Sequence, residues 1–333
     1  MHAVNQKKFI ALSRLALLSC VIVVTAIASI QEVSAQQIAR RSQFIHNPFL
    51  LNPAMAGTQT GTFTSANYRN QWAGFSGAPT TVALSATMGL PNRFGAGIVL
   101  EQDDMGGAMR RTGVEFTGTY TLDLNNEDAV SLGLGLMAQQ LTFDGRDLDV
   151  LEQNDPALTG ALETSFTADA RFGMMVFGKN YAFGLAAPNL LQSAIGWDSE
   201  PTNQRNRLAR HYLLMGHYRY AINNDFTFKP SAVARFTGAT PAQLDAYLNF
   251  SYRQMLWGGI GFRQGDAIVL SIGGGAKDVQ VTYSYDLTTS DVGRLSPHTH
   301  ELTISYYLPR KSGGFNSRSF GGRVLDRSWI IRN

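Results

Sequence analysis

The clearest structural signal in this sequence is the run Val114-Glu115-Phe116-Thr117-Gly118-Thr119-Tyr120-Thr121-Leu122. Its even-numbered residues are mostly large and apolar, whereas its odd-numbered residues are threonines or glutamate. Successive side chains of a β-strand point to opposite faces. The period of two therefore predicts a strand with one apolar and one polar face.

The same period dominates the sequence from residue 62 to residue 308. Clear examples are residues 81–88, 130–138, 166–176, 210–220, 226–236, 244–252, 279–285 and 300–308. Shorter runs begin at Phe94, Tyr181, Leu256 and Ile268. Together they predict an all-β fold of roughly fourteen antiparallel strands, many of them near the 9–11 residues that a tilted strand needs to cross a bilayer.

The connections between these strands alternate between short and long. Short turns are expected at 90–92, 125–128, 179–180, 223–225 and 253–255. Longer links are expected at 102–109, 144–164, 188–206, 237–242 and 288–297, with tighter exceptions at 75–79 and 263–266. A soluble sandwich or propeller has no reason to keep this parity. The parity favours a transmembrane barrel of the outer-membrane type, with tight periplasmic turns and longer outer loops.

The first 35 residues have the composition of an export signal. They contain a basic start at Lys7, Lys8 and Arg14, an apolar run at 15–30 and the small residues Val33-Ser34-Ala35. We predict cleavage after Ala35, so that the mature chain begins at Gln36. A membrane anchor is the alternative. Leu17-Leu18-Ser19-Cys20 also resembles a lipoprotein signal, although the apolar run continues after Cys20.

Composition excludes several classes of protein. Cys20 is the only cysteine, so the mature chain would contain no disulfide or thiol chemistry. The chain has 28 basic and 25 acidic residues, and the signal holds three of the former and one of the latter. The mature protein is therefore close to neutral and has no basic excess for nucleic-acid binding.

Residues 309–333 form a basic, glycine-rich tail. With an even number of strands, both ends of the barrel should face the periplasm. We therefore divide the chain into a signal peptide (1–35), an N-terminal periplasmic or plug-like segment (36–58), the barrel (59–308) and a periplasmic tail (309–333). The tail is either a solvated end or a docking segment anchored by Trp329, Ile330 and Ile331.

No catalytic, cofactor or metal site is predicted. His298 and His300 share one face of the last strand, but the sequence suggests no further ligands. The glycine runs at 258–261 and 273–275 lack the following helix that a phosphate loop requires. Charged residues expected to form ion pairs inside the barrel are Asp169, Arg171, Lys229, Arg235, Asp245, Arg253 and Arg263.

Two short elements near the start carry a family resemblance. The first is Asn52-Pro53-Ala54-Met55-Ala56-Gly57, and the second is Arg69-Asn70-Gln71-Trp72-Ala73-Gly74-Phe75 with a later Pro79. In this order they resemble the opening of the PorP/SprF family of type IX secretion and gliding-associated outer-membrane proteins. Gly89, Gly95, Gly97, Asp104 and the pair His300-Glu301 extend the similarity. Met55 stands where the family usually shows an aromatic residue.

The chemistry of these residues predicts a plug-like element. Pro53 biases the preceding residue to an extended conformation, and Gly57 allows a tight bend into the first strand. Arg69 and Gln71 should alternate onto the lumenal side together with Ser65 and Asn67. We therefore expect them to hold the N-terminal segment inside the barrel mouth through hydrogen bonds. The alternative is that the motif only closes the barrel.

The resemblance implies a non-enzymatic role in the outer membrane. Family members work with the type IX machinery, and several export or anchor one large surface protein through its C-terminal signal domain. Expected partners are therefore outer-membrane lipid, such a cargo protein and periplasmic components of the machinery. The loops at 144–164 and 188–206 are the expected binding elements, because loops on a rigid scaffold often carry binding. A pore or small-molecule channel is the alternative function.

Overall fold

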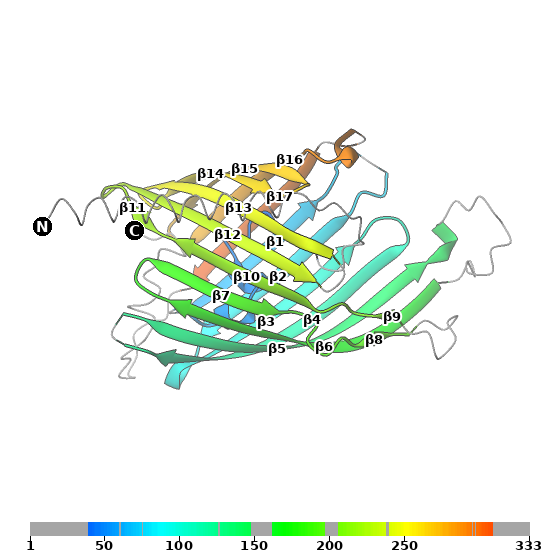
Figure 1. The fold of residues 1–333 in the computed structure, drawn as a ribbon, viewed down its shortest axis with the longest axis horizontal. Coiled ribbons are helices and arrows are strands. Elements are labelled where there is room, and N and C mark those ends of the chain that lie inside the picture. Colours follow the sequence, from blue (N-terminus) through cyan, green and yellow to red (C-terminus); the bar gives the residue numbers. More distant parts are fainter. Residues whose placement is uncertain are drawn as a thin grey trace, which may run out of the picture.

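The strands form one closed barrel in the computed structural model, which describes residues 39–308 apart from 60, 75, 126, 148–161, 197–205, 238–239, 295 and 297. The fourteen strands of its wall run in chain order around the barrel (Figure 1). They are β1 (Thr62–Asn70), β2 (Thr80–Gly89), β3 (Phe94–Asp104), β4 (Met109–Asp123), β5 (Ala129–Asp144), β6 (Leu162–Phe177), β7 (Tyr181–Ala187), β10 (His211–Tyr218), β12 (Phe226–Thr237), β13 (Thr240–Tyr252), β14 (Leu256–Arg263), β15 (Ala267–Ala276), β16 (Val279–Thr288) and β17 (His298–Leu308). The predicted barrel of roughly fourteen antiparallel strands is confirmed.

Pairing between the first and last strands closes the barrel. β1 lies antiparallel to β17 over its whole length, from Thr62 opposite Leu308 to Asn70 opposite His300. The remaining elements are short: β8 (Ala194–Ile195), β9 (Asn206–Arg207), β11 (Tyr220–Ala221) and the 3₁₀ turns η1 (Pro48–Leu50), η2 (Pro53–Met55), η3 (Pro91–Arg93), η4 (Gly145–Asp147) and η5 (Asp291–Arg294). No helix within the described residues is long and apolar enough to cross a membrane.

The two faces of the strands differ as the alternation predicts. On the outside, Phe116 and Leu136 are each 61% exposed, whereas the inward-facing Glu115 is 4% exposed and Ser131 is 0% exposed. An apolar exterior around a polar interior is the arrangement of transmembrane barrels. The exposed apolar side chains are therefore the surface that contacts lipid.

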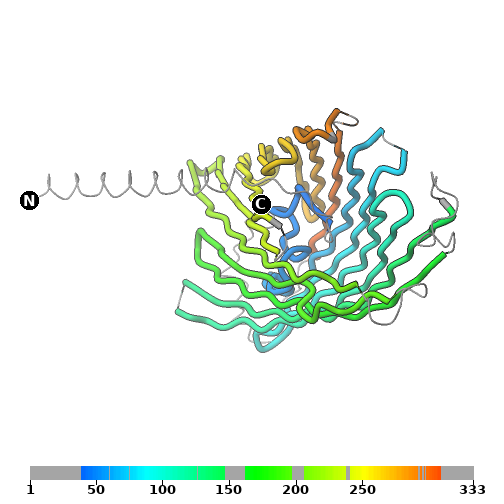
Figure 2. The backbone as a smooth tube through the Cα atoms, turned by 45° about the vertical axis from the view of Figure 1, so that its right-hand side comes forward, coloured from blue at the N-terminus to red at the C-terminus, as the bar shows by residue number. Residues whose placement is uncertain are grey.

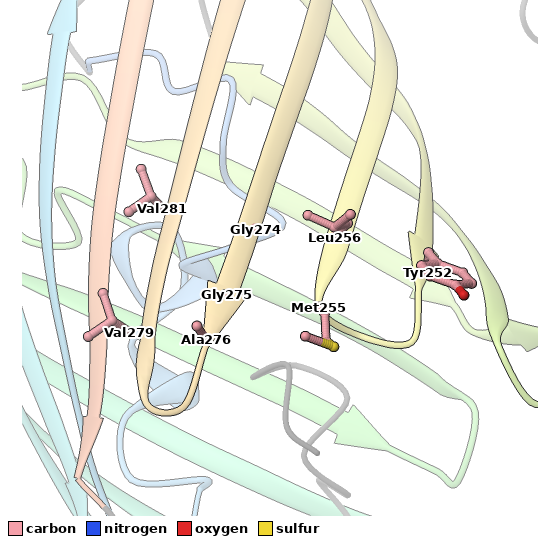
Figure 3. A pocket seen from close by; sticks show the side chains of 8 residues that line it. All are labelled: Tyr252, Met255, Leu256, Gly274, Gly275, Ala276, Val279 and Val281. Atoms are coloured by element: carbon pink, nitrogen blue, oxygen red, sulfur yellow. The ribbon is translucent and has the colours of Figure 1, made fainter.

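A shallow apolar groove interrupts this outer face between β14 and β16. Tyr252 and Leu256 line one side of it, and Val279 and Val281 line the other (Figure 3). Gly274, which has no side chain, lies at its base. Because the groove faces outward among lipid-facing residues, membrane lipid is its expected neighbour.

The two ends of the barrel differ in their connections. One end, the turn end, carries the links at 90–93, 124–128, 178–180, 219–225, 253–255 and 277–278. The other, the loop end, carries the links at 71–79, 105–108, 145–161, 188–210, 238–239, 264–266 and 289–297. The central parts of the predicted long loops, 148–161 and 197–205, lie outside the described residues.

Two predictions about this region were wrong. The link predicted at 237–242 spans only residues 238–239, because Thr237 already pairs with Thr240. Pro241 lies at the accompanying irregularity in the ladder, where no backbone N–H is needed. Arg253, expected in the lumen, lies at the turn end and pairs with Asp225 at 2.8 Å. Its φ of 48° ends the strand alternation on which the prediction depended.

Residues 39–58 lie inside the barrel, and we call them the lumenal segment. In Figure 2 this blue trace lies within the ring of strands. The segment contains η1 and η2, and it contributes Phe44, Ile45, Phe49, Leu50, Leu51, Ala54, Met55 and Ala56 to the main buried apolar cluster. Burial of these side chains is the main favourable contribution to seating the segment.

Candidate functional site

Five polar residues at the loop end fix the start of the lumenal segment, and we call them the Arg69 cluster. They are Ser42 of the segment, with Arg69 (β1), Arg263 (β14), Asp286 (β16) and Glu301 (β17). The Ser42 hydroxyl accepts hydrogen bonds from Arg69 at 2.9 Å and Arg263 at 2.7 Å, and it donates one to Asp286 at 2.6 Å. The Ser42 backbone N–H donates to Glu301 at 2.7 Å. One serine thus joins residues from four strands.

The charges in the Arg69 cluster compensate one another. Arg69 bonds to Asp286 at 2.9 Å and to Glu301 at 3.0 Å, and Arg263 bonds to Asp286 at 3.1 Å. All four charged side chains are buried. Buried charges are tolerated only when they are paired and hydrogen-bonded. Removal of either arginine would therefore leave a buried carboxylate uncompensated.

Neighbouring residues of the lumenal segment extend this polar contact. The Gln43 amide donates to the carbonyl oxygens of Glu301 at 2.8 Å and Thr282 at 3.2 Å. Arg41 forms an ion pair with Glu101 of β3. The lumenal segment is therefore bonded to opposite sides of the barrel wall.

The other predicted lumenal charges mostly form ion pairs or contact this segment. Arg171 pairs with Glu115 at 3.1 Å, Arg235 pairs with Asp245, and Arg263 approaches Asp245 at 3.8 Å. Lys229 Nζ lies 3.5 Å from the Ile45 carbonyl oxygen. Asp169 instead accepts the backbone N–H groups of Leu191 and Ser193, and so fixes the loop that follows β7.

Asn52 fixes the middle of the lumenal segment. Its side-chain oxygen accepts the Ala54 N–H at 2.9 Å and caps η2. Its amide nitrogen donates to the carbonyl oxygens of Met174 at 3.2 Å and Leu185 at 3.1 Å, which belong to adjacent strands β6 and β7. Asn52 is fully buried. One side chain thus shapes the turn and attaches it to the wall.

We expect Asn52→Ala to destabilise the protein by about 1–3 kcal/mol, because it leaves the buried Ala54 N–H without an acceptor. Urea unfolding in detergent measures the loss. Asn249→Ala is the matched control, since Asn249 is a buried lumenal asparagine whose amide nitrogen has no partner. Equal losses in the two variants would contradict the role assigned to Asn52.

Inward-facing glycines make room for the lumenal segment. A Cβ at Gly173 would lie 2.0 Å from Asn52 Oδ1, and one at Gly133 would lie 2.4 Å from the Ala54 nitrogen. At Gly97 it would lie 2.5 Å from Phe49 Cζ. Gly57 has φ of +65° and packs against the Gly95 backbone. The wall is therefore shaped to accept this backbone closely.

The remaining motif residues lie at the loop end, away from Asn52. The Gln71 backbone N–H donates to the Pro79 carbonyl at 2.8 Å, beyond the end of β1. The Trp72 backbone N–H donates to Thr299 at 3.0 Å, and Gly74 is exposed with φ of 97°. Phe75 lies outside the described residues. The structure thus assigns the two halves of the motif to different places.

The two candidate metal-binding histidines lie on the outer face of β17. His300 is 2.6 Å from the Tyr283 hydroxyl, and His298 bonds to the Tyr285 hydroxyl. Within the described part of the chain no group of three or more His, Cys, Asp or Glu could hold a metal ion. Tyrosine hydrogen bonds account for both histidines.

Comparison with known proteins gives one family. The family model described as type IX secretion system membrane protein PorP/SprF matches residues 33–306. No curated protein sequence matches the chain. Similar solved structures include a Pseudomonas aeruginosa FadL homologue at 9% identity, with 75% of this chain and 90% of that chain covered and a TM-score of 0.44.

Two further structures have comparable scores. The CymD monoaromatic hydrocarbon channel is 12% identical, with 84% of this chain and 95% of that chain covered and a TM-score of 0.42. The Acinetobacter baumannii outer membrane protein Omp33 is 8% identical, with 76% and 100% covered and a TM-score of 0.42. These values carry no information about what the present chain binds.

Proposed function

Because the chain belongs to the PorP/SprF family of type IX secretion system membrane proteins, we propose that this outer-membrane barrel aids export or surface anchoring of a large partner protein. The partner is received through its C-terminal signal domain. The role is non-enzymatic: the barrel binds and positions the cargo. Periplasmic components of the same machinery are further proposed partners.

The lumenal segment is the observation that favours this role over an open pore. It is bonded to opposite walls of the barrel and contributes eight residues to the buried apolar cluster. A lumen filled by the protein's own chain suits a scaffold better than a permeation path. We therefore expect low conductance from the wild-type protein in a planar bilayer.

The cargo surface is placed at the loop end. The loop after β7 begins rigidly, since Asp169 accepts two of its backbone N–H groups and Arg210 donates to the Leu190 carbonyl at 2.6 Å. Beyond this base, β8 and β9 pair as a short hairpin. Loops that project from a rigid base often carry binding. Those after β5 and β7 remain our proposed contact elements, and the tail at 309–333 lies outside the described residues.

Deletion of the gene in its native host tests the proposal. Mass spectrometry of surface and medium proteins should show that one adhesin or a small set leaves the surface. The wild-type gene should restore it, whereas a gene with residues 148–161 replaced by a Gly-Ser linker should not. Loss of all type IX cargo would indicate a core component, and unchanged surface and medium proteins would refute the proposal.

A further inference from the structure

A small cavity lies between the lumenal segment and the barrel wall toward the loop end. Its volume is about 70 Å³, and Arg41, Glu101, Glu115, Gln139, Arg171 and Asn189 contribute to its lining. At about 10–15 Å³ per water, this is space for roughly five waters or one small polar group. The cavity is distinct from the Arg69 cluster, none of whose residues line it.

Three buried or nearly buried nitrogen atoms that line this cavity have no hydrogen-bond partner. They are Nε of Arg41, Nε of Arg171 and Nε2 of Gln139. They come from three different elements: the lumenal segment, β6 and β5. An unsatisfied buried donor costs free energy, so native structures rarely leave several together. Their convergence on one space indicates a ligand that supplies acceptors.

The same arginines are held rigidly through their terminal nitrogens. Arg41 Nη2 bonds to Glu101. Arg171 Nη1 bonds to Glu115 at 3.1 Å, and its Nη2 donates to the Phe49 carbonyl at 3.2 Å. These contacts leave the Nε side of each guanidinium unused. The donors are thus positioned before any ligand arrives.

We infer that this cavity is a binding site for one carboxylate group, presented by a peptide that enters from the loop end. Two of the three free donors are guanidinium N–H groups, which prefer an anionic, planar acceptor with two oxygens. Glu101 and Glu115 already have arginine partners and therefore do not satisfy these donors. The carboxylate site stands on the cavity alone, whereas its assignment to a cargo peptide rests on the proposed function.

Titration of the purified full-length protein with acetate, at constant ionic strength in detergent, tests the site. Calorimetry should show saturable binding of acetate and none of acetamide, its neutral analogue. Gln139→Leu should weaken acetate binding about tenfold or more, since a hydrogen bond to a charged group is lost. Gln139→Glu should abolish it, because a like charge replaces the donor.

Asn249→Leu is the matched control. It removes a buried, unpaired amide from the inner wall of β13, and Asn249 does not line this cavity. The dissociation constant of acetate should therefore not change. The inference is overturned if acetate and acetamide behave alike, or if Gln139→Leu binds acetate as wild type does while both variants retain folded mobility on gels.

Two further probes separate the sources of the carboxylate. N-acetylglycine presents a chain-terminal carboxylate, whereas N-acetylglutamate α-amide presents only a side-chain carboxylate. The tighter ligand identifies the source, and failure of both to compete with acetate would refute a peptide occupant. Because none of these titrations contains cargo, their failure is separable from failure of the gene-deletion experiment.

Discussion

Arg69→Ala is expected to lower the free energy of unfolding by about 3–5 kcal/mol, the usual cost of removing one partner from a buried ion pair. Arg69 contacts both Asp286 and Glu301, so its loss leaves negative charge uncompensated inside the barrel. It also removes a hydrogen bond to Ser42. The lumenal segment should therefore leave the wall first, before the strands separate.

Trypsin provides a direct readout of this detachment. The basic residues of the lumenal segment are Arg40 and Arg41, both beside the Arg69 cluster. In Arg69→Ala they should be cleaved much faster than in wild type, and urea unfolding should report the loss of stability. Arg110→Ala removes an exposed ion pair with Asp104 and should cost at most about 1 kcal/mol. Unchanged protection of Arg41 in Arg69→Ala would contradict the role of the cluster.

Gly173→Val is expected to displace the lumenal segment and raise the conductance of the barrel. Its Cβ would lie 2.0 Å from Asn52 Oδ1 and 2.9 Å from Pro53 Cδ, both of which are buried. A contact under 3.0 Å forces a shift, and valine itself suits a strand. The strand should therefore persist while η2 moves away from the wall.

Single-channel recording in planar bilayers measures this effect. Wild type should conduct little, and Gly173→Val should approach the conductance of a chain that lacks residues 39–58. Gly118→Val is the matched control, because a Cβ at Gly118 meets nothing within 4 Å. If Gly173→Val conducts no more than Gly118→Val, then the segment does not close the barrel.

The strand pattern could be predicted because each face of a strand meets one uniform environment, lipid or lumen. This local rule placed Arg69 and Glu115 inward without knowledge of their partners. It failed at Arg253, whose positive φ takes the residue out of the strand. The rule holds only while the backbone stays extended.

The contacts of the lumenal segment could not be predicted, because they join residues far apart in the chain. Ser42 and Glu301 are separated by 259 positions, and no local pattern encodes that distance. The glycines of the wall were also uninformative alone, since Gly133 and Gly173 matter only through Ala54 and Asn52. A usable signal did exist: the run Phe49-Leu50-Leu51 is apolar without alternation, so it could not belong to a two-faced strand.

The position of the Arg69 cluster also constrains the order of assembly. Ser42 precedes every strand, yet two of its partners, Asp286 and Glu301, lie on the last two strands made. Closing contacts of such long sequence separation is entropically costly and slow. A nascent or truncated chain without β16 and β17 lacks both carboxylates that neutralise Arg69. The cluster therefore acts as a completion check, which is satisfied only when the whole chain has arrived and the seam between β1 and β17 has closed around its own first residues.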